Sequence, residues 1–338
     1  ILIITMSCCI CFFNLHLSSD ILTIDGHGEK ETCYLGYGKD KTLKKLWSID
    51  YPHSIGLFYG TFTDFLGYKP DSDEWKVMAL SSFSKKRNKY DKKIDKLITK
   101  TSNGFELDLS FFDYYNFDRR KNMFSDKFVK FFGEKRKKSE KIEKKHFEIA
   151  GALQRKFEDI GFHLLNILKK KSNRSNNIVL AGGAAMNCVF NGKISSKNIY
   201  RNNYIPSYPD DTGVTIGAAL LAHNKFSNKK RIISEETNSN YGPEYSNDYI
   251  KKILKKNKLN FKFYDSKKLY NIIAEKINQN YIVGWFQGKM EFGHRALGNR
   301  SIIASPKNRS MQDKINNAIK FREGYRPFAP AVLDEFAE

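Results

Sequence analysis

Positive side chains and glycines alternate near the C-terminal end of the sequence, in the segments 284–301, GWFQGKMEFGHRALGNRS, and 321–330, FREGYRPFAP. Arginine binds phosphate or carboxylate in a bidentate manner, lysine supplies a point charge, and glycine lets backbone N–H groups approach the same anion. This combination predicts a site for phosphorylated ligands, and a solvated basic loop is the alternative. The candidate anion-binding residues are Lys289, Arg295, Arg300, Arg322 and Arg326.

A carboxylate and two glycines follow a predicted strand early in the chain. The apolar, β-branched run 20–25 ends at Asp25 and continues into a turn that contains Gly26 and Gly28. An acid at a strand end before a glycine turn can lie beside a phosphate chain together with backbone amides. Asp25 is therefore a candidate catalytic residue, and the two glycines are candidate nucleotide contacts. A solvated acid in a hairpin turn is the alternative.

A second transition from strand to glycine lies in residues 177–187. An apolar strand leads into Gly182 and Gly183, and small residues then begin a helix that includes Asn187. Such a turn exposes free N–H groups and the positive end of a helix to a nucleotide. Farther along, the segment 204–213 ends a strand with two acids before a helix, so Asp210 or Asp211 is expected to cap that helix.

Regular elements are expected to position these residues. The sequence predicts a hairpin over 30–49, a helix after the capping residue Ser54, and a long helix over about 139–171. Farther along, it predicts helices over 248–255 and 267–278, a strand over 261–264 and a buried strand over 281–286. His53 is interpreted as a structural hydrogen-bonding group.

Length and charge limit the possible classes of protein. A chain of 338 residues is expected to form two domains, and its net charge is +21. Residues 85–145 hold 20 Lys and Arg against 10 Asp and Glu, and we interpret this basic segment as solvated surface. No nucleic-acid-binding motif is recognised, so phosphorylated small ligands are preferred as partners over nucleic acid.

The glycine-rich basic segment resembles the core motif of the O-carbamoyltransferase family, which includes nodulation and antibiotic-tailoring enzymes. The usual family wording is near GWFQGRMEFGPRALGNRS followed by KFREPFRPFAP; this chain differs at Lys289, His294 and 324–325. A proline normally stands where this chain has His294, and its loss is expected to loosen the loop that aims Arg295. The segment 180–187 also resembles the family wording LAGGVALN.

Two earlier segments carry the same resemblance. Residues 52–59 are similar to the family's PHSLGLFY, and residues 73–80 are similar to GEYKVMGL. The second region lies at the active site in the family, which implies ligand contacts for Glu74 and Lys76. The resemblance also implies that Asp211 is a ligand of a divalent metal, usually iron, together with two histidines of an HHxxHA motif.

The resemblance implies an α/β fold with two domains. The first is a TsaD-like domain of the sugar kinase and actin-like (ASKHA) class over 20–226, shortened at its N-terminus. A linker over 227–246 and the start of a YrdC-like α/β domain over 247–338 follow. Segment 1–19 is set apart, because the expected histidine motif should stand just before Asp20 and does not.

A shifted translation frame is one explanation for the missing histidines. With suitable codons for residues 6–12, a shift of one base encodes Cys-His-Ala-Ala-Ser-Ala-Phe, close to the family's HAASAF. We therefore hypothesise that the first dozen residues are out of frame and that the chain is a fragment. The gene's DNA upstream of Asp20 tests this, because the hypothesis requires a histidine codon in an alternate frame.

The implied reaction has two steps. ATP, with Mg²⁺, and carbamoyl phosphate form carbamoyl-adenylate, and the carbamoyl group then passes to a hydroxyl of a sugar or secondary metabolite. A transferase of the tRNA threonylcarbamoyladenosine type and an inactive nucleotide-binding fragment are the alternatives. The five cysteines favour a reducing, cytoplasmic setting. No membrane partner is expected, since the apolar start of about 15 residues is short for a bilayer span, and a homodimer is left open.

Overall fold

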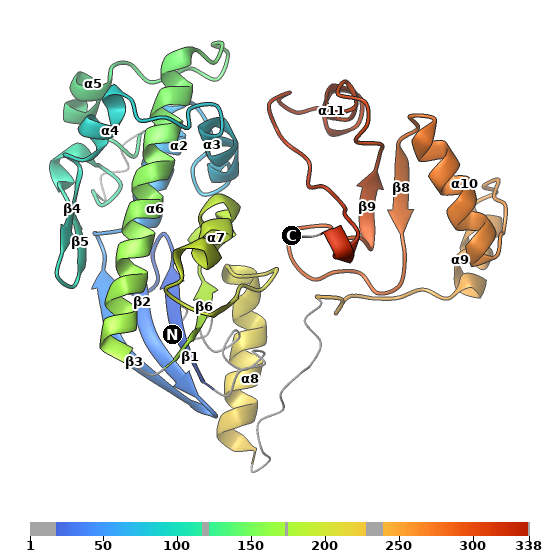
Figure 1. Ribbon diagram of the computed structural model, residues 1–338, viewed down its shortest axis with the longest axis horizontal. Helices are drawn as coiled ribbons and strands as arrows, with labels where there is room; N and C mark the ends of the chain where they lie inside the picture. Colours follow the sequence, from blue (N-terminus) through green and yellow to red (C-terminus); the bar gives the residue numbers. More distant parts are fainter. Residues whose placement is uncertain (1–17, 117–121, 173–174, 228–238, 337–338) are drawn as a thin grey trace. The chain divides into compact units, whose positions relative to one another are not determined.

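The chain folds into two compact units, which divide between Thr237 and Asn238. The computed structural model describes residues 18–116, 122–172, 175–227 and 239–336 (Figure 1). The hypothesised out-of-frame residues up to 17, and part of the predicted linker, lie outside the described residues. We describe each unit by itself.

A mixed five-stranded sheet forms the centre of unit 1, in the order β3-β2-β1-β6-β7 (Figure 1). Strands β1 (Ser18–Ile24), β2 (Glu31–Lys39) and β3 (Thr42–Asp50) are antiparallel neighbours, which confirms the predicted hairpin. Strands β6 (Asn177–Ala181) and β7 (Asn202–Tyr204) run parallel to β1. The architecture confirms the predicted α/β class, and the actin-like assignment stays a prediction.

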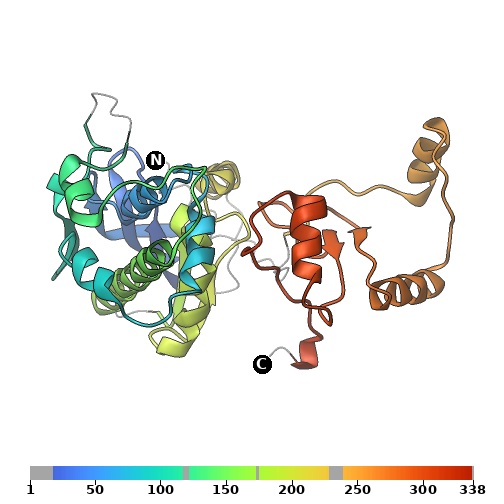
Figure 2. The same cartoon turned by 90° about the horizontal axis from the view of Figure 1, so that it is seen from above.

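The long helix α6 (Lys144–Ser172) lies along one face of this sheet and contacts β1, β2 and β3 (Figures 1 and 2). Its buried residues recur at helical spacing, as the sequence predicted. The predicted start near 139 is wrong by five residues. Arg136 donates a hydrogen bond of 2.6 Å to the carbonyl of Glu140, and the Glu143 N–H donates to Nδ1 of His146, so the residues before Lys144 form turns instead.

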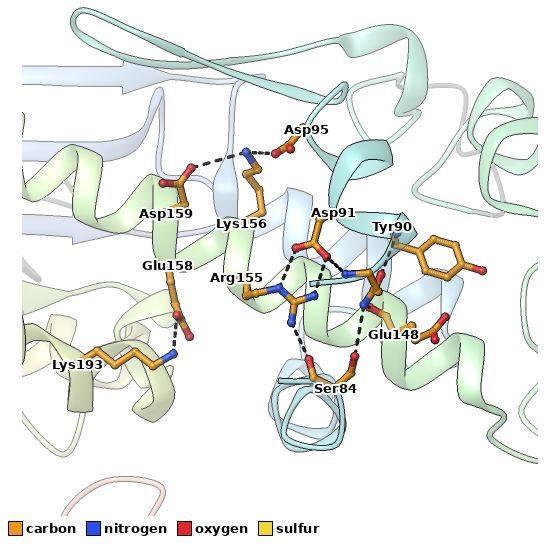
Figure 3. A network of polar contacts seen from close by, with 11 residues as sticks. Ser84, Tyr90, Asp91, Asp95, Glu148, Arg155, Lys156, Glu158, Asp159 and Lys193 are labelled. Atoms are coloured by element: carbon orange, nitrogen blue, oxygen red, sulfur yellow. Dashed lines mark hydrogen bonds and ion pairs between the residues drawn. The ribbon is translucent and has the colours of Figure 1, made fainter. Parts of the chain in front are cut away.

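Ion pairs fix α6 to its neighbours (Figure 3). Arg155 binds both carboxylate oxygens of Asp91 at 2.8 Å and also donates to the carbonyl of Ser84. Glu158 accepts from Lys193 at 2.6 Å. The bidentate pairing of Arg155 with Asp91 is more specific than an ordinary surface ion pair.

Besides α2 (Ile55–Phe65), the other helices and strands of unit 1 are α3 (Glu74–Ser81), α4 (Lys89–Ile94), β4 (Ile98–Thr101), β5 (Gly104–Leu107), α5 (Asp126–Phe132), α7 (Cys188–Ile194) and α8 (Val214–Phe226).

Helix α2 (Ile55–Phe65) carries a buried aromatic cluster. Its cap is the predicted one, because Ser54 Oγ accepts from the Leu57 N–H at 3.0 Å. The fully buried Phe62 ring lies 5.1 Å from that of Phe128 and 5.3 Å from that of Phe132, and both partners belong to the basic segment. The interpretation of this segment as solvated surface is therefore incomplete, since its phenylalanines are core. His53 Nδ1 accepts from the Leu107 N–H, which confirms its structural role.

Unit 2 contains helices α9 (Asn247–Lys256) and α10 (Ser266–Asn278), as predicted, and a hairpin of β8 (Val283–Phe286) and β9 (Arg300–Ile303). Helix α11 (Met311–Ile315) follows. The predicted strand over 261–264 is wrong, because these residues have no regular secondary structure. The predicted burial of 281–286 is also wrong: Gly284 and Phe286 are exposed, since a two-stranded hairpin packed on a helix leaves one face open. No helix in the described ranges has both the length and the apolar content needed to cross a bilayer.

The aromatic cluster predicts a large contribution of Phe62 to stability. Phe62→Ala should lower the free energy of unfolding by about 3 to 5 kcal/mol, since it leaves a cavity among close-packed rings. The matched control is Phe83→Ala, because Phe83 is 58% exposed, and it should change stability by less than about 1 kcal/mol. Urea unfolding followed by circular dichroism measures both, and equal losses would contradict the assignment of the core.

Candidate functional site

Three predicted site segments meet at one edge of the sheet in unit 1. Asp25 directly follows β1, Gly182 directly follows β6, and Asp210 follows β7. Because these strands are parallel, their carboxyl ends lie at the same edge. The carboxylate of Asp25 accepts from the backbone of Gly183 and is close enough to Asp210 and Asp211 to experience their charges. The tertiary structure thus brings these predicted residues together.

The Asp25 carboxylate has one bonded and one unbonded oxygen. Its Oδ1 accepts from the Gly26 N–H at 2.7 Å, whereas its buried Oδ2 has no hydrogen-bond partner within the described ranges. The pKa of Asp25 is raised to about 6, chiefly by burial; the backbone N–H groups of Gly26 and Gly183 oppose this rise, and the negative charges of Asp211 and Asp210 add to it. Such a group can accept a hydrogen bond or a proton from a ligand hydroxyl near neutral pH.

Close backbone contacts hold this carboxylate in place. Gly182 has a φ of +85°, and a Cβ there would lie 2.0 Å from the carbonyl oxygen of Ile24. Its N–H donates to the carbonyl of Pro209 at 2.7 Å. A Cβ at Gly56 would lie 2.6 Å from the carbonyl oxygen of Asp25, so α2 also approaches the turn closely. Only glycine permits both approaches.

Asp210 and Asp211 have different roles. Asp210 caps the turn before α8, since its Oδ1 accepts from the backbone and hydroxyl of Thr212, as one alternative predicted. Asp211 is exposed. A metal site needs further ligands, and no group of three or more His, Cys, Asp and Glu in the described ranges could hold one. The described donors therefore do not complete the implied iron site.

Other predicted contacts are bound to neighbouring residues. The Gly28 N–H donates to the carbonyl of Glu31 and closes its turn. Asn187 caps α7 by accepting from the Phe190 N–H, and its amide also exchanges two hydrogen bonds with Gln154. The two polar atoms of the Asn187 side chain are thus already used by the protein. Sequence reasoning missed the buried Gln154, whose only signal was a polar residue within the apolar stripe of α6.

Glu74 and Lys76 lie on α3, and both contact residues just before the start of this helix. Glu74 Oε1 accepts from the Asp71 N–H at 2.8 Å, and burial raises the pKa of this carboxyl. Lys76 pairs with Asp73 at 3.2 Å and lies over the ring of Trp75. These contacts hold both side chains near the preceding turn, and a ligand role for them stays a prediction.

A cluster of cations forms in unit 2. Arg295 is exposed on the loop between β8 and β9, and its guanidinium makes no hydrogen bond or ion pair with any described residue. Arg322 and Arg326 are near enough to experience its charge. Burial first, and repulsion from neighbouring arginines second, lower the pKa of Arg326, while Glu323 partly opposes this. Three converging cations that repel one another form an arrangement suited to an anion.

The other two predicted cations differ in their surroundings. Lys289 is exposed on the same loop. Arg300 Nε instead donates to the buried carboxylate of Glu291 at 2.9 Å. Sequence reasoning missed Glu291, which the sequence marks as an acid between apolar Met290 and Phe292 inside a run of cations. The structure therefore ties one of the five predicted anion ligands to an internal partner.

Comparison with known families agrees with this pair of units. Residues 9–220 match the carbamoyltransferase N-terminus, and residues 274–338 match the carbamoyltransferase C-terminus. The chain belongs to the carbamoyltransferase family. This confirms the resemblance inferred from the sequence motifs.

Relatives of this carbamoyltransferase chain include proteins from several bacteria. It is 36% identical over 322 residues to the uncharacterized protein sll1178 from Synechocystis sp., covering 93% of this chain and 52% of the relative. It is 31% identical over 320 residues to nodulation protein NolNO from Sinorhizobium fredii, covering 94% and 44%. Nodulation protein NolO from Bradyrhizobium diazoefficiens is 29% identical, with 94% and 55% covered. The chain thus spans about half the length of these relatives.

The strand-end geometry of unit 1 predicts that any side chain at Gly182 destabilises the fold. Gly182→Ala should lower the free energy of unfolding by at least about 2 kcal/mol, because its Cβ would overlap the Ile24 carbonyl and its φ is positive. Gly192→Ala is the matched control: it lies within α7, a Cβ there meets nothing within 4 Å, and alanine favours helix. Denaturant unfolding compares the two, and a tolerated Gly182→Ala would contradict the described approach of β6 to β1.

The buried oxygen of Asp25 predicts a pH-dependent cost to stability. Because the folded-state pKa is about 6 and the ordinary value is 3.8, ionised Asp25 destabilises the fold progressively as the pH rises between these values. Asp25→Asn should therefore be more stable than wild type above about pH 6, with the difference vanishing below about pH 4. Urea unfolding across this range tests it, with Asp40→Asn in the exposed β2–β3 turn as control. A difference independent of pH would show that burial does not perturb Asp25.

Proposed function

We propose that this chain forms part of an O-carbamoyltransferase that makes carbamoyl-adenylate from ATP and carbamoyl phosphate and then carbamoylates a hydroxyl group. The observation that carries the proposal is the exposed Arg295 of the glycine-rich loop, with Arg322 and Arg326 from a later segment of unit 2 near enough to experience its charge. Two polyanions must approach each other in the first step, and clustered guanidinium groups offset their repulsion. Membership of the carbamoyltransferase family supports a transferase reaction.

The first step has a defined balance. Carbamoyl phosphate, ATP and one water yield carbamoyl-adenylate, inorganic phosphate and pyrophosphate. Water would first cleave carbamoyl phosphate to carbamate and inorganic phosphate. A carbamate oxygen would then attack the α-phosphorus of ATP, and the bond from that phosphorus to the oxygen bridging to the β-phosphate would break, which releases pyrophosphate. Lys289, Arg295, Arg322 and Arg326 would bind the phosphate groups, while Mg²⁺ bound to ATP would offset charge on the triphosphate. Arg300 would contribute through the shape of the loop.

The second step is assigned to unit 1. The acceptor hydroxyl oxygen attacks the carbamoyl carbon, AMP leaves, and the hydroxyl proton must be removed. Asp25 is suited to orient that hydroxyl and receive its proton, because its Oδ2 has no described partner and its pKa is about 6. Gly26, Gly182 and Gly183 would present backbone groups to the nucleotide at the same sheet edge.

The acceptor is assigned only by chemical class. A sugar or secondary-metabolite hydroxyl fits the proposed chemistry, and two of the relatives are named nodulation proteins. The proposed partners are thus ATP, carbamoyl phosphate and a hydroxyl-bearing small molecule, in a cytoplasmic setting.

Arg295 tests the first step. In the full-length gene product, Arg295→Ala should abolish pyrophosphate release from ATP that depends on carbamoyl phosphate, because the loop loses its exposed and unpaired guanidinium. The matched control is Arg309→Ala, which removes an exposed arginine of unit 2 outside the cluster and should retain activity. A coupled pyrophosphate assay measures both. Unchanged release in Arg295→Ala would refute the proposed role of the cluster.

A further inference from the structure

Glu291 is a buried carboxylate inside the cationic loop. Its side chain is only 2% exposed. Its Oε1 accepts from the N–H groups of Leu297 and Asn299, each at 2.7 Å, and its Oε2 accepts from Arg300 Nε at 2.9 Å. Three donors, one of them charged, therefore converge on a single acid from positions six to nine residues farther along the chain.

These bonds determine the path of the loop around Arg295. Between Glu291 and Leu297 the chain must bulge outward, because both ends of that segment are fixed at the same carboxylate. Arg300 Nη2 also donates to the carbonyl of Arg295, at 3.4 Å. On the other side, the Asn299 amide donates to the carbonyl of Lys289 at 2.6 Å. The backbone carbonyls of the exposed cations Lys289 and Arg295 thus accept hydrogen bonds from Asn299 and Arg300, and these two residues in turn donate to Glu291.

We propose that Glu291 is a positioning residue that orients Arg295 toward the bound anion, and that Arg300 acts through Glu291 instead of binding the anion itself. The inference rests on the proposed function in that it assumes a phosphorylated ligand at the cation cluster. It changes the role of Arg300, which the motif alone predicts to be an anion ligand.

Electrostatics explain why an acid stands inside an anion site. A carboxylate facing the ligand would weaken anion binding, but Glu291 is buried and its charge is offset by Arg300 and two backbone dipoles. These donors hold its pKa near 2 despite burial. The carboxylate therefore remains ionised near neutral pH, and its hydrogen bonds to Leu297, Asn299 and Arg300 keep the strength of charge-assisted bonds.

A second buried polar side chain, that of Asn316, holds the segment that carries Arg322 and Arg326. Asn316 is fully buried, and its Oδ1 accepts from Arg322 Nε at 2.6 Å. Its amide donates to the carbonyls of Gly324 and Arg326, at 3.4 and 3.3 Å. The loop that carries Arg295 is thus attached to buried Glu291, and the segment that carries Arg322 and Arg326 is attached to buried Asn316. Neither attachment uses the guanidinium of Arg295, which is available for a ligand.

A double-mutant cycle tests this on the whole chain, with inorganic pyrophosphate as the probe and isothermal titration calorimetry as the measurement. Glu291→Gln should weaken pyrophosphate binding by about tenfold or more, and Arg295→Ala should weaken it at least as much. The double variant should be no weaker than Arg295→Ala alone, because Glu291 acts through Arg295. Glu275→Gln, which neutralises an exposed acid on α10, is the matched control and should bind normally.

Arg300→Met provides the second arm of the test. It should reproduce the loss seen in Glu291→Gln, and combining the two should add nothing further. If the losses add in full, Arg300 binds the anion directly and the inference is wrong. If Glu291→Gln fails to fold by circular dichroism, Arg300→Met combined with Arg295→Ala decides the question in the same way: a coupled loss supports the inference and an additive loss overturns it.

The outcomes also separate this inference from the proposed function. If Arg295→Ala binds pyrophosphate as tightly as wild type, the cluster is not the anion site, and the proposed function fails. If Arg295→Ala weakens binding and Glu291→Gln does not, the proposed function stands and the role assigned to Glu291 is overturned.

Discussion

Repulsion among like charges is the constraint on which unit 2 depends. Burial lowers the pKa of Arg322 and of Arg326, and the nearby charge of Arg295 lowers both in the same direction. Such a cluster separates unless the chain holds it. Two buried side chains hold it in place. Glu291 accepts hydrogen bonds from two backbone N–H groups and from Arg300, and Asn316 accepts a hydrogen bond from Arg322. The site is therefore built from buried acceptors outward.

The strand-end site of unit 1 depends on close steric contact. Its parallel strands end together, and glycines at 56 and 182 let the neighbouring backbones approach the turn that carries Asp25. The result is a carboxylate with one oxygen bonded to backbone N–H groups and another left without a described partner. Ionised Asp25 therefore costs stability at this point.

The basic charge of the chain has several physical uses. In unit 1, Lys135 pairs with the buried Asp64 at 2.6 Å, and Arg136 is buried against the backbone carbonyl of Leu66 and the ring of Tyr68. These cations belong to the packing around the aromatic cluster. In unit 2, by contrast, Arg295 is exposed and unpaired among the described residues. Net charge by itself does not distinguish these two situations.

The local sequence pattern correctly predicted those structural features that depend only on residues close together in the chain. The hairpin of β2 and β3, the Ser54 cap, helices α9 and α10 and the α/β class all follow from spacing, capping and turn chemistry within a few residues. The family could likewise be inferred from contiguous motifs, because the residues that carry the resemblance lie close together in the chain.

Tertiary structure decided which of those residues are free to act. Whether Arg300 meets an anion or Glu291, and whether Asn187 meets a nucleotide or Gln154, depends on side chains that compete for the same donors. The burial of Phe128 has the same origin, since its ring packs against that of Phe62, which lies far away in the sequence. The sequence alone determined the chemical groups and their local turns, whereas only the folded chain decided their partners, because hydrogen bonds and burial are settled in three dimensions.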